Sequence, residues 1–129
     1  MRIEHIAIWA EDLEKLKAFY TKYFQATAGE RYLNPRKNFQ SYFLTFESGC
    51  RLELMQMPGN IRNANSVENQ LAGLTHFAIS TGSKTTVDAL TEQLRNDGHR
   101  VVGEPRTTGD GYYESVVLDP EGNRIEITV

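Results

Sequence analysis

Two histidines and two glutamates in this sequence have the residue types and the spacing of a metal-binding set: His5, Glu53, His76 and Glu126. Imidazole nitrogens and carboxylate oxygens both bind divalent first-row metals, and two of each suit Ni, Co, Fe, Mn or Zn. Four protein ligands leave an octahedral ion two positions for water or substrate. The four residues therefore predict a site for one divalent ion, provided that the fold brings them together.

The four residues occupy matched places in two copies of one sequence pattern. The copies are I-E-H-I-A-I at 3–8 with L-T-H-F-A-I at 74–79, and G-C-R-L-E-L at 49–54 with G-N-R-I-E-I at 122–127. The first pair of segments is offset by 71 positions and the second by 73, which disfavours a chance match. Self-similarity of this kind indicates duplicated structural units. We expect one domain over 1–129, made of a module at 1–57, a linker at 58–72 and a second module at 73–129.

Apolar spacing predicts the same order of elements, βαβββ, in both modules. The first module is expected to hold a strand at 2–9, a helix at 11–24, and strands near 27–33, at 39–47 and at 51–57. The second is expected to hold a strand at 74–80, a helix at 84–96, and strands near 100–103, at 112–118 and at 124–129. Asp12 or Glu11 can cap the first helix and Ser83 the second, since their side-chain oxygens accept from free backbone amides. The predicted fold class is α+β, with two tandem βαβββ modules forming a curved, barrel-like mixed sheet around a metal cleft.

Alternation along the strands predicts where the candidate ligands point. In the first strand His5 shares a face with Ala7, and the bulky Ile6 and Ile8 share the opposite face, which we expect under the helix. The closing strand repeats this arrangement, because Glu53 alternates with leucines. The second module has the same pattern. A partly buried carboxylate without a partner costs several kcal/mol, so a cation on this face is favoured.

A structural alternative exists for each of the four residues. A single histidine in a strand is usually a hydrogen-bonded structural residue, and each glutamate follows an arginine, Arg51 or Arg124, by two positions on the same face. Those arginines could form ion pairs with Glu53 and Glu126. A metal site is favoured because both residue types recur at matched positions in both modules.

Composition limits the classes of partner. The chain has 14 basic and 17 acidic residues, a formal charge of −3, and no block of Lys or Arg, so we expect no nucleic-acid partner. No apolar run approaches the roughly 20 residues that span a bilayer, so no membrane partner is expected. Cys50 is the single cysteine, which excludes an internal disulfide and favours a reducing, cytoplasmic location. A small-molecule substrate is the partner that these observations favour.

The duplicated pattern, the pair HIAI and HFAI, and the closing L-D-P-E-G-N-R-I-E-I resemble the vicinal oxygen chelate superfamily over nearly the whole chain. This superfamily includes glyoxalase I, methylmalonyl-CoA epimerase, extradiol dioxygenases and the fosfomycin and bleomycin resistance proteins. Glyoxalase I has His, Glu, His and Glu as its metal ligands, in the order that this chain supplies. Epimerases have Gln where this chain has Glu53, and the transferases and dioxygenases typically use three protein ligands.

The resemblance implies a metal-dependent lyase or isomerase similar to glyoxalase I (lactoylglutathione lyase), with Glu126 as the leading general base and Glu53 as the second carboxylate. It also implies nickel or cobalt as the favoured metal, a thiol cosubstrate such as glutathione, and a homodimer in which a site takes ligands from one chain or from two. Two alternatives stay open: a resistance-type thiol transferase or dioxygenase, and a module that binds a small molecule without chemistry.

Overall fold

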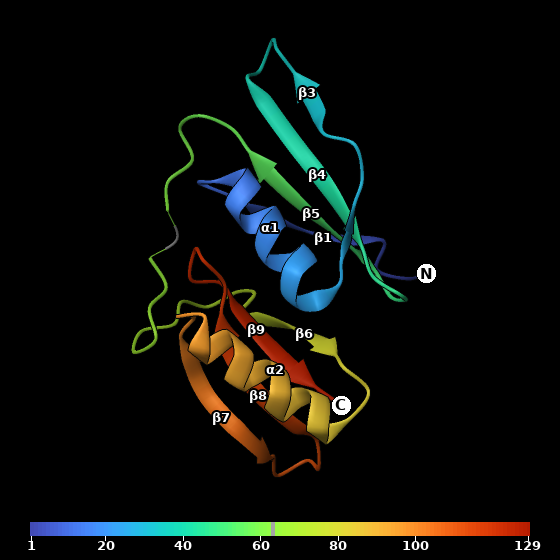
Figure 1. Cartoon of the computed structure of the whole chain (residues 1–129). Coiled ribbons are helices and arrows are strands. Elements are labelled where there is room, and N and C mark those ends of the chain that lie inside the picture. Colours follow the sequence, from blue (N-terminus) through green and yellow to red (C-terminus); the bar gives the residue numbers. More distant parts are fainter. Residues whose placement is uncertain (63) are drawn as a thin grey trace. The chain divides into compact units, whose positions relative to one another are not determined.

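The computed structural model describes residues 1–62 and 64–129 of the chain. They form two compact units, Met1–Asn63 and Ala64–Val129, and the boundary falls within the segment 58–72. Each unit has its own sheet and its own helix (Figure 1). The assignment of both units to a single domain stays a prediction.

The first unit is a mixed sheet with one helix. Its elements are β1 (His5–Trp9), α1 (Leu13–Phe24), β2 (Thr27–Ala28), β3 (Tyr32–Asn34), β4 (Phe39–Thr45) and β5 (Arg51–Gln56). The strand order is β1-β5-β4-β2, and β3 also pairs with β4. β1 runs parallel to β5, and the other pairs are antiparallel. The first and last strands of the unit are therefore neighbours, although more than 40 residues separate them along the chain.

The second unit repeats this topology with four strands. Its elements are β6 (His76–Ser80), α2 (Lys84–Asn96), β7 (Val101–Thr107), β8 (Tyr113–Leu118) and β9 (Arg124–Thr128). The strand order is β6-β9-β8-β7, with β6 parallel to β9 and the other pairs antiparallel. The α+β class and the repeated βαβββ order predicted from the sequence are confirmed.

Both helices begin where their capping residues predict. The Asp12 side chain accepts a hydrogen bond from the Lys15 amide at 3.0 Å, and the Ser83 hydroxyl accepts one from the Thr86 amide at 3.1 Å. One face of each helix is buried against its sheet. The buried side chains are Leu13, Leu16, Phe19, Tyr20, Tyr23 and Phe24 in α1 and Val87, Leu90, Thr91 and Leu94 in α2.

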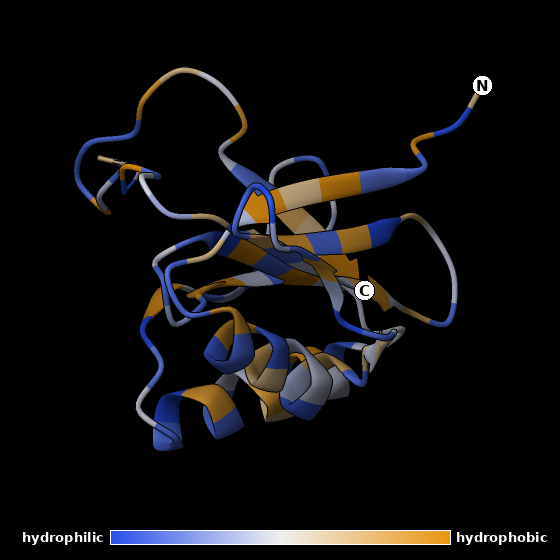
Figure 2. Cartoon of the chain, turned by 90° about the horizontal axis from the view of Figure 1, so that it is seen from above, coloured by the Kyte–Doolittle hydropathy of each residue, from blue (hydrophilic) through white to orange (hydrophobic). Residues whose placement is uncertain are grey.

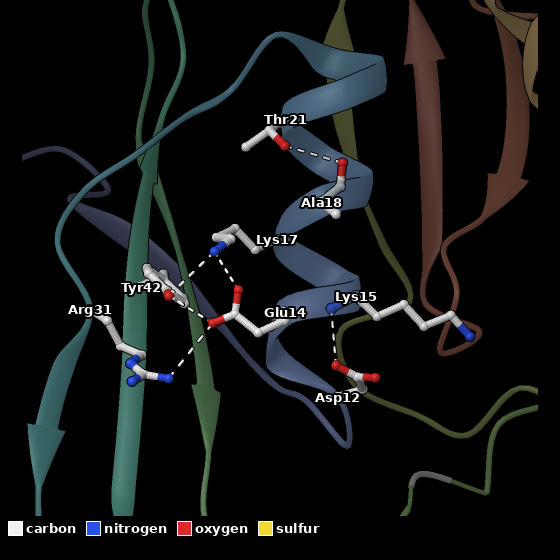
Figure 3. Close-up of polar contacts among 8 residues, drawn as sticks. All are labelled: Asp12, Glu14, Lys15, Lys17, Ala18, Thr21, Arg31 and Tyr42. Carbon is white, nitrogen blue, oxygen red and sulfur yellow. Dashed lines mark hydrogen bonds and ion pairs between the residues drawn. The ribbon is translucent and has the colours of Figure 1, made fainter.

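A polar network joins α1 to β4 at the edge of the first core (Figure 3). The hydroxyl of the buried Tyr42 donates to Glu14 Oε1 at 2.7 Å, and Lys17 Nζ donates to the same hydroxyl at 3.3 Å. Lys17 also forms an ion pair with Glu14, and an Arg31 nitrogen lies 3.9 Å from the Glu14 carboxylate. These contacts give the tyrosine hydroxyl the polar partners that a buried group requires.

The strands alternate between a buried face under the helix and a more open face. Leu52 and Leu54 in β5 are buried, as are Ile125 and Ile127 in β9, while the residues between them are only half-buried. Figure 2 shows this alternation as hydrophobic and hydrophilic bands along the strands. The predicted faces are therefore confirmed, with both candidate glutamates on the open side.

Two strand predictions differ most from the structure. The single strand expected near 27–33 is divided into β2 and β3, because its register with β4 shifts by one residue between the pairs Ala28–Leu44 and Tyr32–Ser41. The strand expected near 100–103 continues to Thr107 through irregular register at Gly103. Within the described residues, neither helix has the length and apolar character needed to cross a membrane.

Candidate functional site

In the first unit, His5 and Glu53 lie next to each other on the open face of the sheet. Ala7 pairs with Glu53 across the parallel strands β1 and β5, and His5 pairs with Arg51 one step earlier on the same face. The His5 Nε2 atom lies 3.8 Å from Glu53 Oε2. The histidine side chain is 40% exposed and the glutamate side chain 15%. The small Ala7 side chain leaves space beside the carboxylate.

The second unit builds the same pair in the same register. Ala78 pairs with Glu126 across β6 and β9, and His76 pairs with Arg124. The His76 Nε2 atom lies 3.3 Å from Glu126 Oε2, with side-chain exposures of 45% and 19%. The two His–Glu pairs therefore agree in strand pairing, side-chain direction and burial. A duplicated sequence has kept the same polar pair in both of its copies.

The residue before each histidine contacts the other ring nitrogen. Glu4 Oε2 lies 2.5 Å from His5 Nδ1, and Thr75 Oγ1 lies 3.1 Å from His76 Nδ1. A carboxylate only accepts, so in the neutral imidazole Nδ1 of His5 carries the proton and Nε2 presents its lone pair toward Glu53. Hydrogen bonds from His5 and then Arg51 lower the pKa of the Glu4 carboxyl. Partners of this kind commonly orient histidines that bind metals.

The arginines of the structural alternative have other partners. Arg51 donates to Glu4 through two of its nitrogens, and its guanidinium carbon lies 4.0 Å from the centre of the Phe43 ring. Arg124 donates to the carbonyl oxygen of Val67 at 3.0 Å. Within the described residues, neither guanidinium forms an ion pair with Glu53 or Glu126. The carboxylates of the two pairs are thus not neutralised in the way that this alternative requires.

The geometry of the second pair fits two donor atoms of one divalent ion, and that of the first pair is close to it. Metal–nitrogen and metal–oxygen bonds of about 2.1 Å place two ligands about 3.0 Å apart at a right angle and about 3.4 Å apart at the tetrahedral angle. The His76–Glu126 separation of 3.3 Å lies within this range, and the His5–Glu53 separation of 3.8 Å requires a small closure. Nitrogen and carboxylate oxygen are also the donor types that such ions take.

The structure thus brings the four predicted residues together as two pairs. In residues 1–62 and 64–129, no group of three or more His, Cys, Asp or Glu side chains has an arrangement that could hold a metal ion. Whether both pairs share one ion depends on how the units are arranged, within one chain or between two chains. The four-ligand set therefore stays a prediction, and the structure shows the two His–Glu pairs.

One further carboxylate lies beside the second pair, and the sequence analysis missed it. Glu114 on β8 pairs across the strands with Thr128, two residues from Glu126 on the same face. Burial first, and then a hydrogen bond with Glu126, raises the pKa of the Glu114 carboxyl. An Arg106 nitrogen lies 3.8 Å from Glu114 on the neighbouring strand. Alternation along 113–118 could have identified Glu114, because it places this side chain on the face of Glu126.

Comparison with known proteins places the fold. A family model described as the Glyoxalase/Bleomycin resistance protein/Dioxygenase superfamily matches residues 2–127. No curated protein matches the chain.

Several solved structures have the same fold at low sequence identity. Glyoxalase I from Zea mays is 23% identical with a TM-score of 0.79, and the match covers 98% of this chain and 44% of the maize protein. The chain thus spans less than half the length of that relative. The trypanothione-dependent glyoxalase I of Leishmania major is 22% identical with a TM-score of 0.76, covering 99% and 86% of the two chains. A glyoxalase/bleomycin resistance protein/dioxygenase domain from Frankia sp. is 17% identical with a TM-score of 0.82, covering 100% and 97%.

Proposed function

This chain belongs to the Glyoxalase/Bleomycin resistance protein/Dioxygenase superfamily, and on that premise we propose that it is a divalent-metal-dependent lyase or isomerase resembling glyoxalase I (lactoylglutathione lyase). It would move a proton on the carbon next to a metal-chelated carbonyl group. The proposed ligands are His5, Glu53, His76 and Glu126. The observation that supports this proposal most strongly is the repeated His–Glu pair, with each Nε2 turned toward its glutamate.

The residues of the chain have separate roles in this reaction. The two imidazoles would hold the ion, and their Nδ1 contacts with Glu4 and Thr75 orient the rings. When bound, a divalent ion supplies Lewis-acid polarisation of the substrate oxygens. One glutamate then takes the proton from the adjacent carbon and returns it to the neighbouring one, which typically contributes about 10²–10⁴-fold to the rate.

Glu126 is the proposed base, and Glu53 is the second carboxylate. The two glutamates occupy equivalent register positions, but their neighbours differ. Glu126 has the Glu114 carboxyl within hydrogen-bonding reach, whereas Glu53 pairs across the strands with the apolar Phe43. A second carboxyl beside Glu126 provides a place to share the proton that the base takes up. This difference supports assigning the proton transfer to the second unit.

The metal and the cosubstrate of the proposal follow from the resemblance. Nickel or cobalt is favoured, with zinc, manganese or iron as alternatives, and the cosubstrate is a thiol such as glutathione. The proposal also includes a cytoplasmic homodimer. Analytical ultracentrifugation would measure its mass.

Metal content and turnover together test this function. The purified protein is stripped with a chelator and titrated with Ni²⁺ and with Zn²⁺, and the bound metal is counted by elemental analysis. Four shared ligands predict one ion per chain, whereas two independent pairs would bind two weaker ions. The loaded protein is then assayed for conversion of methylglyoxal in the presence of glutathione. One ion per chain without turnover would remove glyoxalase activity but retain the metal site, and no binding would contradict the proposal.

Substitution of the two glutamates tests their roles. We expect Glu126→Gln to reduce kcat by about 10²–10⁴-fold while the protein still binds one ion, because the amide oxygen can remain a ligand but cannot take the proton. Glu53→Gln should have the smaller effect on kcat. Glu47→Gln, at an exposed position in the β4–β5 turn, is the matched control. Near-normal turnover by Glu126→Gln with its metal retained would assign the proton transfer to another group.

A further inference from the structure

The open face of the first sheet has a row of mostly apolar side chains next to the His5–Glu53 pair. The strand pairings place Trp9 beside Met55, Met55 beside Ser41, and Ser41 beside Tyr32. This row crosses β1, β5, β4 and β3, one step along the open face from Ala7 and Glu53. Three of its four members are aromatic or otherwise apolar. An apolar row on an open sheet face is the kind of feature that marks binding.

The equivalent row of the second unit has the opposite character. There the pairings place Ser80 beside Thr128, Thr128 beside Glu114, and Glu114 beside Arg106. The His–Glu pairs are thus the same in both units, whereas the rows next to them have diverged, one to apolar side chains and one to polar and charged side chains. Both rows lie on the sheet faces turned away from the helices, so packing between helix and sheet does not account for the difference.

The aromatic side chains of the first row contact one another through Phe39. The Phe39 ring lies 6.1 Å from the Trp9 ring at 90° and 6.1 Å from the Tyr32 ring at 60°. Trp9 is 46% exposed and Tyr32 is 55% exposed, whereas Ser41 between them is only 2% exposed. Trp9, Tyr32 and Phe39, here called the aromatic cluster, therefore present ring surface outward on the same face as the buried serine.

The aromatic surface continues to the candidate metal pair. Phe43 pairs with Glu53 across β4 and β5, and its ring lies 5.5 Å from the His5 ring in an edge-on arrangement. Arg51 lies over the same phenylalanine ring. A ligand held at His5 and Glu53 through its oxygens would have Phe43 beside it. The aromatic cluster would lie next to it, at the neighbouring row of side chains on the same face of the sheet.

We propose that the aromatic cluster of Trp9, Tyr32 and Phe39 binds a planar, apolar group of a small substrate whose oxygens are held at the His5–Glu53 pair. This assignment rests on the proposed metal site and adds a substrate class to it: a chelating carbonyl compound that carries an aromatic substituent. Aromatic rings bind other rings in edge-on and offset arrangements, and an open half of the Trp9 surface is available for such a contact.

The size of the surface favours a small molecule over a protein. A stable protein interface uses about 20–30 residues and about 800 Å² on each partner. The aromatic cluster has three residues and is bordered by the polar imidazole of His5 and by the charged side chains of Glu53 and Arg51. A small ligand that combines metal-binding oxygens with one ring matches this combination of polar and apolar groups.

Two hydroxamates that differ only in one substituent test the proposal. Acetohydroxamate and benzohydroxamate chelate divalent metals through the same pair of oxygens, and only the second carries a ring. Trp9 is the only tryptophan of the chain, so its fluorescence reports directly on the aromatic cluster. Binding to the Ni²⁺-loaded protein is measured by this fluorescence and by calorimetry. We expect benzohydroxamate to bind about tenfold or more tightly and to change the Trp9 emission.

A matched pair of variants identifies the cluster as the source of the preference. Phe39→Ala keeps the reporter and removes the central ring, so the preference for benzohydroxamate should fall toward onefold while acetohydroxamate binding is unchanged. Leu33→Ala is the control, because Leu33 is similarly exposed on β3 but alternates to the other face from Tyr32. The control should keep the full preference.

The outcomes separate this proposal from the metal site itself. Equal affinity for the two hydroxamates, or a preference that survives Phe39→Ala, would overturn the aromatic assignment while leaving the metal site intact. If no metal binds, the same two titrations are carried out on the metal-free protein. A change of Trp9 fluorescence with benzohydroxamate but not with acetohydroxamate supports ring binding by the aromatic cluster. No change with either compound overturns it. A change of oligomeric state in Phe39→Ala, seen by sedimentation, would assign the cluster to contact with a second copy and would also overturn the proposal.

Discussion

Replacement of Asp119 by alanine should destabilise the second unit, because this buried carboxylate holds the turn between β8 and β9. Its Oδ1 atom accepts from the amides of Glu121 and Asn123, each at 2.9 Å, and its Oδ2 atom accepts from the Asn123 side chain at 2.8 Å. Asp119 is only 4% exposed. A side chain that accepts hydrogen bonds from two backbone amides in this way defines the turn and fixes where the following strand begins.

The expected magnitude follows from these contacts. A hydrogen bond to a charged group contributes about 1.5–3 kcal/mol. Alanine at position 119 removes both bonds to backbone amides, and water can replace part of them because Glu121 and Asn123 are half-buried. We therefore expect Asp119→Ala to lower the free energy of unfolding by about 3 kcal/mol. Asp119→Asn keeps one acceptor oxygen for both amides, and its expected cost is about 1 kcal/mol.

Urea unfolding of the metal-free protein, followed by far-ultraviolet circular dichroism, measures these differences. Hydrogen exchange of the β8 and β9 amides localises the change to the second unit. Glu47→Ala, in the exposed turn of the first unit, is the control and should stay within about 0.5 kcal/mol of the unchanged protein. Because the turn precedes Glu126, Asp119→Ala should also weaken metal binding. A loss of stability below about 0.5 kcal/mol would refute the role assigned to the carboxylate.

Two further predictions concern pairs of polar residues. Tyr42→Phe should lower the free energy of unfolding by about 1 kcal/mol at neutral pH, because it removes the hydroxyl that donates to Glu14. Hydrogen bonds from Lys17 and then Tyr42 lower the Glu14 pKa below 4.5, so the stabilisation they give is lost as the pH falls through the folded pKa. In urea unfolding, the difference in stability between Tyr42→Phe and the unchanged protein should therefore be smaller at about pH 3 than at neutral pH. An equal difference at both pH values would contradict this. Glu114→Gln should raise the thermal midpoint of the metal-free protein at neutral pH. Burial and then Glu126 raise the Glu114 pKa above 4.5, so the stability present below that pH is lost as the pH rises through the folded pKa. The gain should vanish at about pH 4, and a gain that is constant with pH would exclude ionisation of Glu114 as its source.

The duplication explains why so much of the local structure could be predicted. Helical spacing and the caps at Asp12 and Ser83 located both helices within two residues, and alternation assigned the faces of β5 and β9 correctly. Each copy also served as a check on the other. The break between β2 and β3 was missed, since it is a one-residue shift in the pairing with β4, which local periodicity does not reveal.

The partners of the candidate ligands were harder to predict. Glu4 and Thr75 adjoin the histidines in the sequence, but only the rotation of each ring shows that they contact Nδ1. Arg51 and Arg124 have the right spacing for ion pairs with the glutamates, yet they bond to Glu4 and to a backbone carbonyl. Spacing along a strand places two side chains on one face without deciding which neighbour each of them bonds to.

The sequence by itself determined the duplicated units, their helices and the face of each strand on which the histidines and glutamates lie, because these features depend on local periodicity and on residues close together in the chain. The tertiary structure decided that His5 meets Glu53 and that His76 meets Glu126, since parallel pairing of the first and last strands of each unit sets that register across more than 40 residues. It also decided that Glu114 lies beside Glu126 and that Trp9, Tyr32 and Phe39 meet on one face. Contacts between strands depend on the hydrogen-bond register of the folded sheet, and a one-residue shift in that register would separate every one of these groups.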